Sequence, residues 1–282
     1  MLDRSKIDYK IKDNTNWRDK YKQSDSAYAF ATPSNFIIHG PSRSGKTSCL
    51  EQILTNEKLA IFDIVIYISK HEGDIHRVLE EKYPNKFLPL FTNNNMEEDI
   101  QNAIELLQRQ TYDTETQIVE NLKSNVNSSL LKLIDILCEE EELSIAVIFD
   151  DVIVDYKNSD DKDMVKIVEK LFAHYLKKGV STFLISQNFS KSVPSQSRTN
   201  YNYFITFNVP KKSSDSQAIN KFILSSSFGF NDKASKLVDE VSQNQYVFAV
   251  FDRENLTGLR IKEVDGVEEN CRCRLKFDKF IN

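Results

Sequence analysis

One short loop constrains the fold of this chain more than any other feature. Residues 40–47 read GPSRSGKT and match the pattern G-x-x-x-x-G-K-[ST] at all its fixed positions. An apolar run at 35–39 precedes the loop, and a stretch compatible with a helix follows at 48–54. A strand, a glycine-rich loop and a helix in this order form a phosphate-binding loop. The alternative, an ordinary turn that contains glycine, does not explain this combination.

The residue types of this loop predict how it binds phosphate. Successive backbone N–H groups, together with the N-terminus of the following helix, can cradle a triphosphate. Lys46 can reach the β- and γ-phosphates, and Thr47 can offer its hydroxyl to Mg²⁺. The residues expected to bind the nucleotide are Gly40, Pro41, Ser42, Arg43, Ser44, Gly45, Lys46, Thr47 and Ser48.

Composition narrows the class of protein. The 282 residues are 40% hydrophobic and include 18 phenylalanines, which is enough for a sizeable core. The net charge of −5 argues against a surface coated with basic residues, but positive charge can still gather on a few loops that contact nucleic acid. We expect no membrane span and no signal peptide, and therefore a soluble intracellular protein.

The four cysteines are too few and too scattered to form a disulfide framework. Cys271 and Cys273 make a C-x-C pair without a second pair elsewhere in the sequence. We interpret them as reduced thiols in a strand rather than as half of a metal site.

From residue 35 onward, short apolar runs alternate with longer helical segments. This alternation predicts an α/β fold with a mainly parallel central sheet and flanking crossover helices. Toward the C-terminus, two apolar runs around a polar turn predict a β-hairpin at 246–251 and 259–262. The other strands are expected near 35–39, 62–69, 145–149, 181–186 and 202–208.

The pattern divides the chain into an arm and one domain. Residues 1–30 form either a loosely ordered arm or an arm that docks on a neighbouring subunit. Residues 31–282 are expected to form the nucleotide-binding domain. Within it, 96–142 repeats apolar residues at helical spacing, which predicts a helical insertion between the second and third strands. Residues 211–282 form a C-terminal extension, with helices expected at 217–224 and 233–242.

A second element of the site is predicted downstream of the loop. The apolar strand at 145–149 ends in Asp150 and Asp151, which is the form of a Walker B element. Asp150 is expected to hold Mg²⁺ through water, and Asp151 to act as the base that orients the attacking water. The alternative is a strand-end turn in which one of the two carboxylates caps a helix.

The following strand also ends in polar side chains. Gln187 directly follows the run at 182–186, and Asn188 comes next. We predict that Gln187 is a sensor of the γ-phosphate or its water, with Asn188 as the alternate; an amide paired with loop backbone is the structural alternative. The order of phosphate-binding loop, strand, Walker B and polar-tipped strand indicates a motor-type NTPase rather than a signalling GTPase, whose Asn-Lys-x-Asp reader the sequence lacks.

Several segments together resemble a known group of viral ATPases. They lie at 186–194, 198–200 and 203–207, with further similarity at 148–151, 171–179 and 246–252. Over about residues 34–262 the chain resembles the poxvirus-type genome-packaging ATPases of large DNA viruses and virophages, which are similar to the FtsK/HerA motor group. The resemblance implies a RecA/FtsK-like ATPase that binds ATP and Mg²⁺ and pumps double-stranded DNA into a preformed capsid. It also implies a homo-oligomeric ring, of five or six subunits, that meets a capsid or portal vertex.

Further roles and a location follow from the same resemblance. A ring motor needs a cation donated across the subunit interface, and Arg198 is the first candidate, although it is equally explained as a surface residue or a DNA contact. Arg43 is able to touch phosphate or a neighbouring subunit. Lys191, Lys211 and Lys212 lie on loops that could contact the DNA backbone. The expected location is the host cytoplasm or nucleus where the virus assembles, or the virion.

Two departures from the family keep other functions open. Asp151 stands where many motor ATPases carry glutamate, and the segment 172–178 lacks an arginine that the family leads us to expect. Another P-loop nucleic-acid motor or helicase is therefore one alternative. A nucleotide-gated assembly scaffold with vestigial hydrolysis is the other.

Overall fold

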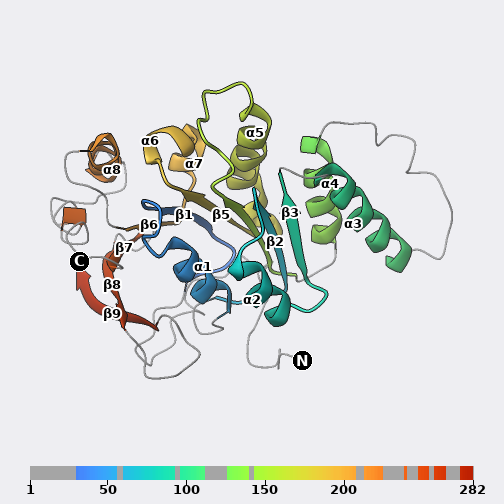
Figure 1. Ribbon diagram of the computed structural model, residues 1–282, viewed down its shortest axis with the longest axis horizontal. Helices are drawn as coiled ribbons and strands as arrows, with labels where there is room; N and C mark the ends of the chain where they lie inside the picture. Colours follow the sequence, from blue (N-terminus) through green and yellow to red (C-terminus); the bar gives the residue numbers. More distant parts are fainter. Residues whose placement is uncertain are drawn as a thin grey trace.

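A mixed β-sheet with helices on both faces organises the chain (Figure 1). The computed structural model describes residues 30–55, 60–92, 96–111, 126–139, 143–207, 213–224, 238–239, 247–253, 257–264 and 274–281. The strands are β1 (Asn35–His39), β2 (Ile64–Ser69), β3 (Phe87–Phe91), β4 (Ile145–Asp150), β5 (Val180–Ser186), β6 (Tyr203–Thr206), β7 (Val247–Asp252), β8 (Thr257–Val264) and β9 (Arg274–Ile281). The helices and helical turns are α1 (Lys46–Thr55), α2 (Asp74–Lys82), α3 (Met96–Thr111), α4 (Val126–Glu139), α5 (Lys162–Lys170), η4 (Leu171–Tyr175), η5 (Leu176–Lys178), α6 (Phe189–Ser192), α7 (Ser195–Thr199) and α8 (Ser214–Leu224).

The strand order in the sheet is β3-β2-β4-β5-β1-β6-β7-β8-β9. From β3 to β6 every neighbouring pair is parallel, and β7, β8 and β9 join in antiparallel orientation. The predicted mainly parallel α/β sheet is therefore confirmed, as is the C-terminal hairpin, which β7 and β8 form. β9 adds a third antiparallel strand that the sequence pattern did not predict.

The sheet is covered on both faces, which explains why its central strands are mainly apolar. Every residue of β1 is buried. Phe36 and Ile38 lie in one buried cluster with Leu50 of α1, whereas Ile37 lies in another with Val168 of α5. Side chains alternate between the faces of a strand, so the two clusters form on opposite sides of the sheet. The helices α1 and α2 cover one side, and α3 to α8 cover the other (Figure 1).

The strand order brings the predicted active-site segments to one edge. β5 lies between β1 and β4, which confirms the predicted extra strand between the loop strand and the Walker B strand. Parallel neighbours end on the same side of a sheet, and ligands of open α/β sheets bind beyond these carboxyl ends. His39, Asp150 and Ser186, the last residues of β1, β4 and β5, therefore lie together at that edge.

One strand was missed, and this changes the position of the helical insertion. β3 is the outermost strand of the parallel part of the sheet and contains Pro89. Proline lacks a backbone N–H and is confined to edge strands, so the apolar run around it gave no clear strand signal. The helices α3 and α4 confirm the predicted insertion, but they follow β3 and so lie between the third and fourth strands, not between the second and third.

Some expectations concern residues outside those described. They are the 1–30 arm apart from Phe30, the pair Cys271 and Cys273, the lysines Lys211 and Lys212, and most of the helix at 233–242. Cys49 and Cys138, which are described, form no disulfide. Within the described ranges, no helix combines the length and the apolar character needed to cross a membrane.

Candidate active site

The phosphate-binding loop has a backbone shape that only certain residues adopt easily. Gly45 has a φ of 100° and Arg43 a φ of 61°, both in the left-handed region. The loop begins beside β5, where the N–H of Gly40 donates to the Ser186 carbonyl at 3.1 Å. It ends in the first turn of α1, whose N–H groups have no partner within the helix. The Ser44 hydroxyl is buried and unpaired among the described residues. A bound phosphate would satisfy these donors, so the loop fits the nucleotide it was predicted to bind.

Gly40 is required by close packing. A Cβ atom at this position would lie 2.6 Å from the Ser44 Oγ and 2.7 Å from the Phe207 Cβ. We expect Gly40→Ala to lower the free energy of unfolding by about 1–3 kcal/mol, because β6 and the loop would have to separate. Urea unfolding at neutral pH measures this. Gly73→Ala is the matched control, since its added Cβ would meet no atom closer than 4.0 Å. Equal losses in the two variants would contradict the packing argument.

The Lys46 side chain forms hydrogen bonds with the backbone of its own loop. Its side chain is buried, and Nζ donates to the carbonyls of Gly40 at 2.9 Å and Pro41 at 3.0 Å. Burial lowers the pKa of Lys46, and the nearby carboxylates of Asp151 and Asp150 oppose this shift. The ammonium thus lies in the field of both Walker B acids, at the place where a phosphate chain would need a counter-charge.

Asp150 ends β4 and is held by a tyrosine from the neighbouring strand. The Tyr67 hydroxyl of β2 donates to Asp150 Oδ2 at 2.6 Å. Burial raises the pKa of Asp150, while this hydrogen bond opposes the shift. Thr47 exposes its hydroxyl at the start of α1. A hydroxyl and a carboxylate are hard oxygen donors that suit Mg²⁺, which keeps several waters and takes its other ligands from phosphates. Among the described residues, no group of three or more His, Cys, Asp or Glu is placed to hold a metal ion.

Asp151 and Gln187 meet across the tips of β4 and β5. The Gln187 amide donates from Nε2 to Asp151 Oδ2 at 2.5 Å. Asp151 has a φ of 51°, and its N–H donates to the Ile185 carbonyl at 3.3 Å. Aspartate is enriched in this left-handed conformation relative to longer side chains. The backbone therefore offers a physical reason for aspartate at a position where glutamate was expected.

Two other predicted residues are engaged with backbone. Asn188 caps α6, accepting from the Lys191 N–H at 3.1 Å and from the Ser190 hydroxyl at 2.9 Å, which leaves Gln187 as the better sensor. Arg198 donates to the carbonyls of Val193, Phe189 and Ser190 at 3.0, 2.9 and 3.1 Å. Its role across a subunit interface stays a prediction, and that role would require these three hydrogen bonds to break.

Tyr67 is a member of the site that sequence reasoning missed. Its only signal was one phenol in the strand IVIYIS, which is aliphatic apart from Tyr67 and the last residue, Ser69. We expect Tyr67→Phe to raise the Mg²⁺ concentration needed for half-maximal hydrolysis by about 10-fold, because the carboxylate of Asp150 loses the donor that orients it. A Mg²⁺ titration of ATP turnover measures this effect.

Tyr203→Phe is the matched control for this substitution. It removes a buried hydroxyl on β6, which accepts a hydrogen bond from the Ala31 N–H at 3.0 Å. We expect it to lower stability without changing the Mg²⁺ dependence. Identical Mg²⁺ curves for Tyr67→Phe and the unmodified protein would remove Tyr67 from the metal site.

His39 predicts a pH dependence of stability. The pKa of His39 is lowered to about 4: burial is the main cause and the Lys46 charge adds to it, while Asp215 and a hydrogen bond with the Ser186 backbone oppose the shift. In the unfolded chain the imidazole titrates near its ordinary pKa of about 6.5. The stabilisation is therefore present above about pH 6.5 and is lost as the pH falls toward the folded value. We expect His39 to account for a loss of about 2 kcal/mol at pH 5. Urea unfolding of wild type and His39→Asn at pH 7.5 and pH 5 measures it, and parallel losses in the two proteins would contradict it.

Comparison with known proteins agrees with this geometry. A family model described as an ATPase domain predominantly from Archaea matches residues 26–244. The chain belongs to this ATPase family. It is a P-loop ATPase. No curated protein sequence matches the chain.

Solved structures similar to this ATPase include the genome-packaging NTPase B204 from Sulfolobus turreted icosahedral virus 2. Its complex with AMPPCP has a TM-score of 0.51 and 12% sequence identity, over 80% of this chain and 96% of that one. The complex with AMP has a TM-score of 0.52 and 13% identity, over 80% and 95% of the two chains. At this identity the likeness establishes a shared fold.

Proposed function

We propose that this ATPase is a translocase that drives double-stranded DNA into a preformed capsid at the site of virus assembly. It would work as a homo-oligomeric ring of five or six subunits that docks on a capsid or portal vertex. The proposal is supported by the fold shared with the viral packaging NTPase B204 and by the segments that resemble the poxvirus-type packaging ATPases.

The described residues would divide the chemistry of hydrolysis among them. Lys46 would leave the carbonyls of its own loop and bind the β- and γ-phosphates, where its charge stabilises the transferring group. Mg²⁺, held by Thr47 and Asp150, supplies Lewis-acid neutralisation of phosphate charge when bound. Asp151 would orient the attacking water, and Gln187 would contact the γ-phosphate or that water.

The hydrogen bond between Gln187 and Asp151 is the observation that carries this proposal. Oδ2 of the carboxylate that would orient the water accepts a hydrogen bond from the sensor amide at 2.5 Å. The predicted sensor therefore lies beside the predicted base, where the two could act together on the γ-phosphate and the attacking water. A motor would need such a coupled pair, because turnover must wait for its substrate or for a neighbouring subunit.

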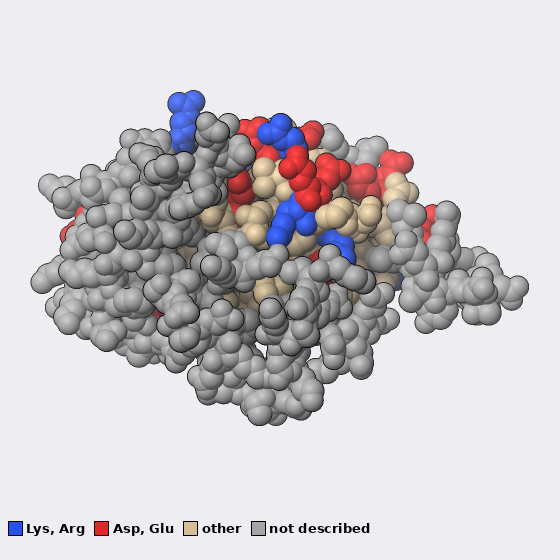
Figure 2. All heavy atoms as spheres, turned by 90° about the horizontal axis from the view of Figure 1, so that it is seen from below, with Lys and Arg blue, Asp and Glu red and all other residues tan. Residues whose placement is uncertain are grey.

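Contacts with DNA would come from loops rather than from a broad basic face. On the face in Figure 2, the described surface mixes acidic and basic side chains. Lys191, on α6 directly after the sensor strand, is exposed and remains a candidate contact. Packaging must ignore sequence, so we expect contacts to phosphates and an affinity that falls steeply with salt.

ATP turnover measured with and without linear blunt-ended duplex DNA, together with mass photometry, tests the proposal. Turnover that rises with duplex and coincides with ring formation would support a packaging translocase. Unwinding of a forked duplex would instead identify a helicase. Turnover indifferent to DNA, with assembly that still requires ATP, would point to a nucleotide-gated scaffold.

A further inference from the structure

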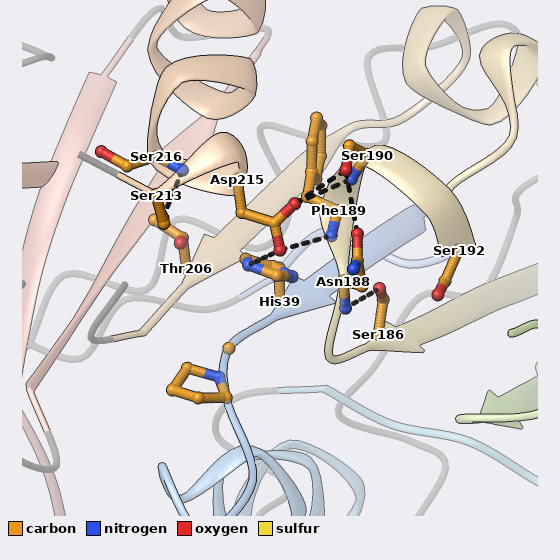
Figure 3. A network of polar contacts seen from close by, with 12 residues as sticks. His39, Ser186, Asn188, Phe189, Ser190, Ser192, Thr206, Ser213, Asp215 and Ser216 are labelled. Carbon is orange, nitrogen blue, oxygen red and sulfur yellow. Dashed lines mark hydrogen bonds and ion pairs between the residues drawn. The ribbon is translucent and has the colours of Figure 1, made fainter. Parts of the chain in front are cut away.

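The turn that follows the sensor residue is held by side chains from three different places in the chain. This turn is α6, which begins two residues after Gln187. Asn188 caps it from within, Arg198 of α7 reaches it from one element, and Asp215 of α8 reaches it from another. Figure 3 shows the Asp215 carboxylate pointing at the first residues of the turn, with His39 close by.

Asp215 uses both carboxylate oxygens on this turn. Oδ2 accepts from the Phe189 N–H at 3.2 Å, and Oδ1 accepts from the Ser190 N–H at 3.1 Å and the Ser190 hydroxyl at 3.0 Å. Oδ2 also lies 3.9 Å from Nε2 of His39, the residue directly before the phosphate-binding loop. A carboxylate on the first N–H groups of a helical turn is a favourable arrangement because those groups carry partial positive charge. One side chain of α8 thus connects the sensor turn with the start of the loop.

Arg198 contacts the same two residues through their backbone carbonyls rather than their N–H groups. Its guanidinium donates to the carbonyls of Phe189 and Ser190 and lies 4.8 Å from the centre of the Phe189 ring. The N–H groups of Phe189 and Ser190 therefore donate to the Asp215 carboxylate, and their carbonyls accept from the Arg198 guanidinium. Phe222 of α8 adds an apolar contact, with its ring centre 5.1 Å from that of Phe189. The position of the turn is fixed as long as α8 is docked.

We propose that Asp215 is a positioning residue that sets Gln187 and makes ATP hydrolysis depend on the docking of α8. The proposal rests on the sensor role proposed for Gln187. A turn clamped by Asp215 fixes the backbone directly after Gln187, and so fixes where the amide can reach. When α8 shifts, the clamp opens and the amide loses its defined position relative to Asp151 and the γ-phosphate. α8 belongs to the C-terminal extension, so this contact transmits the state of that extension to the site.

A double-mutant cycle between Asp215→Asn and Gln187→Ala tests the proposal on basal ATP turnover without DNA. Asp215→Asn keeps the size of the side chain but removes its charge and one acceptor. We expect kcat to fall about 10- to 100-fold, because a sensor held loosely is misplaced, while KM for ATP stays within about twofold. In the double variant, kcat should lie less than about twofold below that of Gln187→Ala alone, because Asp215 acts through the residue that has already been removed. Asp135→Asn, which breaks a surface ion pair with Lys178, is the matched control and should leave turnover unchanged.

The outcomes separate this inference from the proposed function. Losses that multiply in the double variant would show that Asp215 does not act through Gln187 and would overturn the inference alone. Full turnover in Gln187→Ala would overturn the sensor role and the inference with it. If Asp215→Asn lowers the unfolding temperature too far to assay, Ser190→Ala replaces it in the cycle, because it removes one hydrogen bond to the same carboxylate. A smaller fall in kcat that again disappears in the Gln187→Ala background supports the proposal, and a fall that persists overturns it.

Discussion

Replacing Lys46 with alanine should reduce ATP turnover at least about 100-fold, because a preorganised charge on the transferring phosphate is lost. The buried ammonium lies in the field of Asp150 and Asp151, so the site is built around a cation at this position. Steady-state turnover at saturating Mg²⁺, with nucleotide affinity from a fluorescent ATP analogue, measures the loss of both chemistry and binding.

The control for Lys46 is a lysine of the same charge outside the site. Lys166 pairs with Asp163 on α5, and its side chain is 70% exposed. We expect Lys166→Ala to retain wild-type turnover. Thermal unfolding of both variants distinguishes a lost catalytic charge from a lost fold. A folded Lys46→Ala protein with turnover within twofold of wild type would contradict the assignment of this loop as the phosphate site.

Replacing Asp151 with asparagine should lower kcat by about 100-fold or more and leave KM for ATP nearly unchanged, because a base that acts in the chemical step is lost. The left-handed backbone at this residue makes asparagine the right substitution, since asparagine also adopts this conformation readily. The Asn Oδ1 atom can still accept the hydrogen bond from Gln187. Comparing the wild type with Asp151→Asn therefore isolates the effect of the carboxylate charge on kcat.

Two further variants make the Asp151 result specific. Asp160→Asn removes an exposed acid in the same loop, where Asp160 accepts a hydrogen bond from the Ser159 hydroxyl at 3.3 Å, and should leave kcat unchanged. Asp151→Glu keeps the charge but places a longer side chain on a left-handed backbone, so we expect it to be less stable than Asp151→Asn in urea. Turnover above half of wild type in Asp151→Asn would assign the base to another residue.

Much of the fold could be predicted because its signals are local. Runs such as residues 35–39 and 145–149 have apolar centres, and each is bounded by polar or glycine-containing segments, so parallel strands buried on both faces could be located. The placement of β3 failed because Pro89 weakens the strand pattern at an edge. The same signals predicted two helices in the insertion, since apolar residues recur at helical spacing regardless of what lies around them.

The sequence by itself located the glycine-rich loop, the two acids after the 145–149 strand and Gln187, because each follows a recognisable strand and the carboxyl ends of parallel strands meet at one edge. Only the tertiary structure decided which partners hold them. Tyr67 reaches Asp150 from 83 residues away, and Asp215 reaches Phe189 across 26. Such contacts depend on the order of strands in the sheet and on where α8 packs, and no spacing within a single segment encodes them. The left-handed backbone of Asp151, directly after β4, is likewise known only from the structure, and it offers a reason for a residue that the sequence alone presented as a departure.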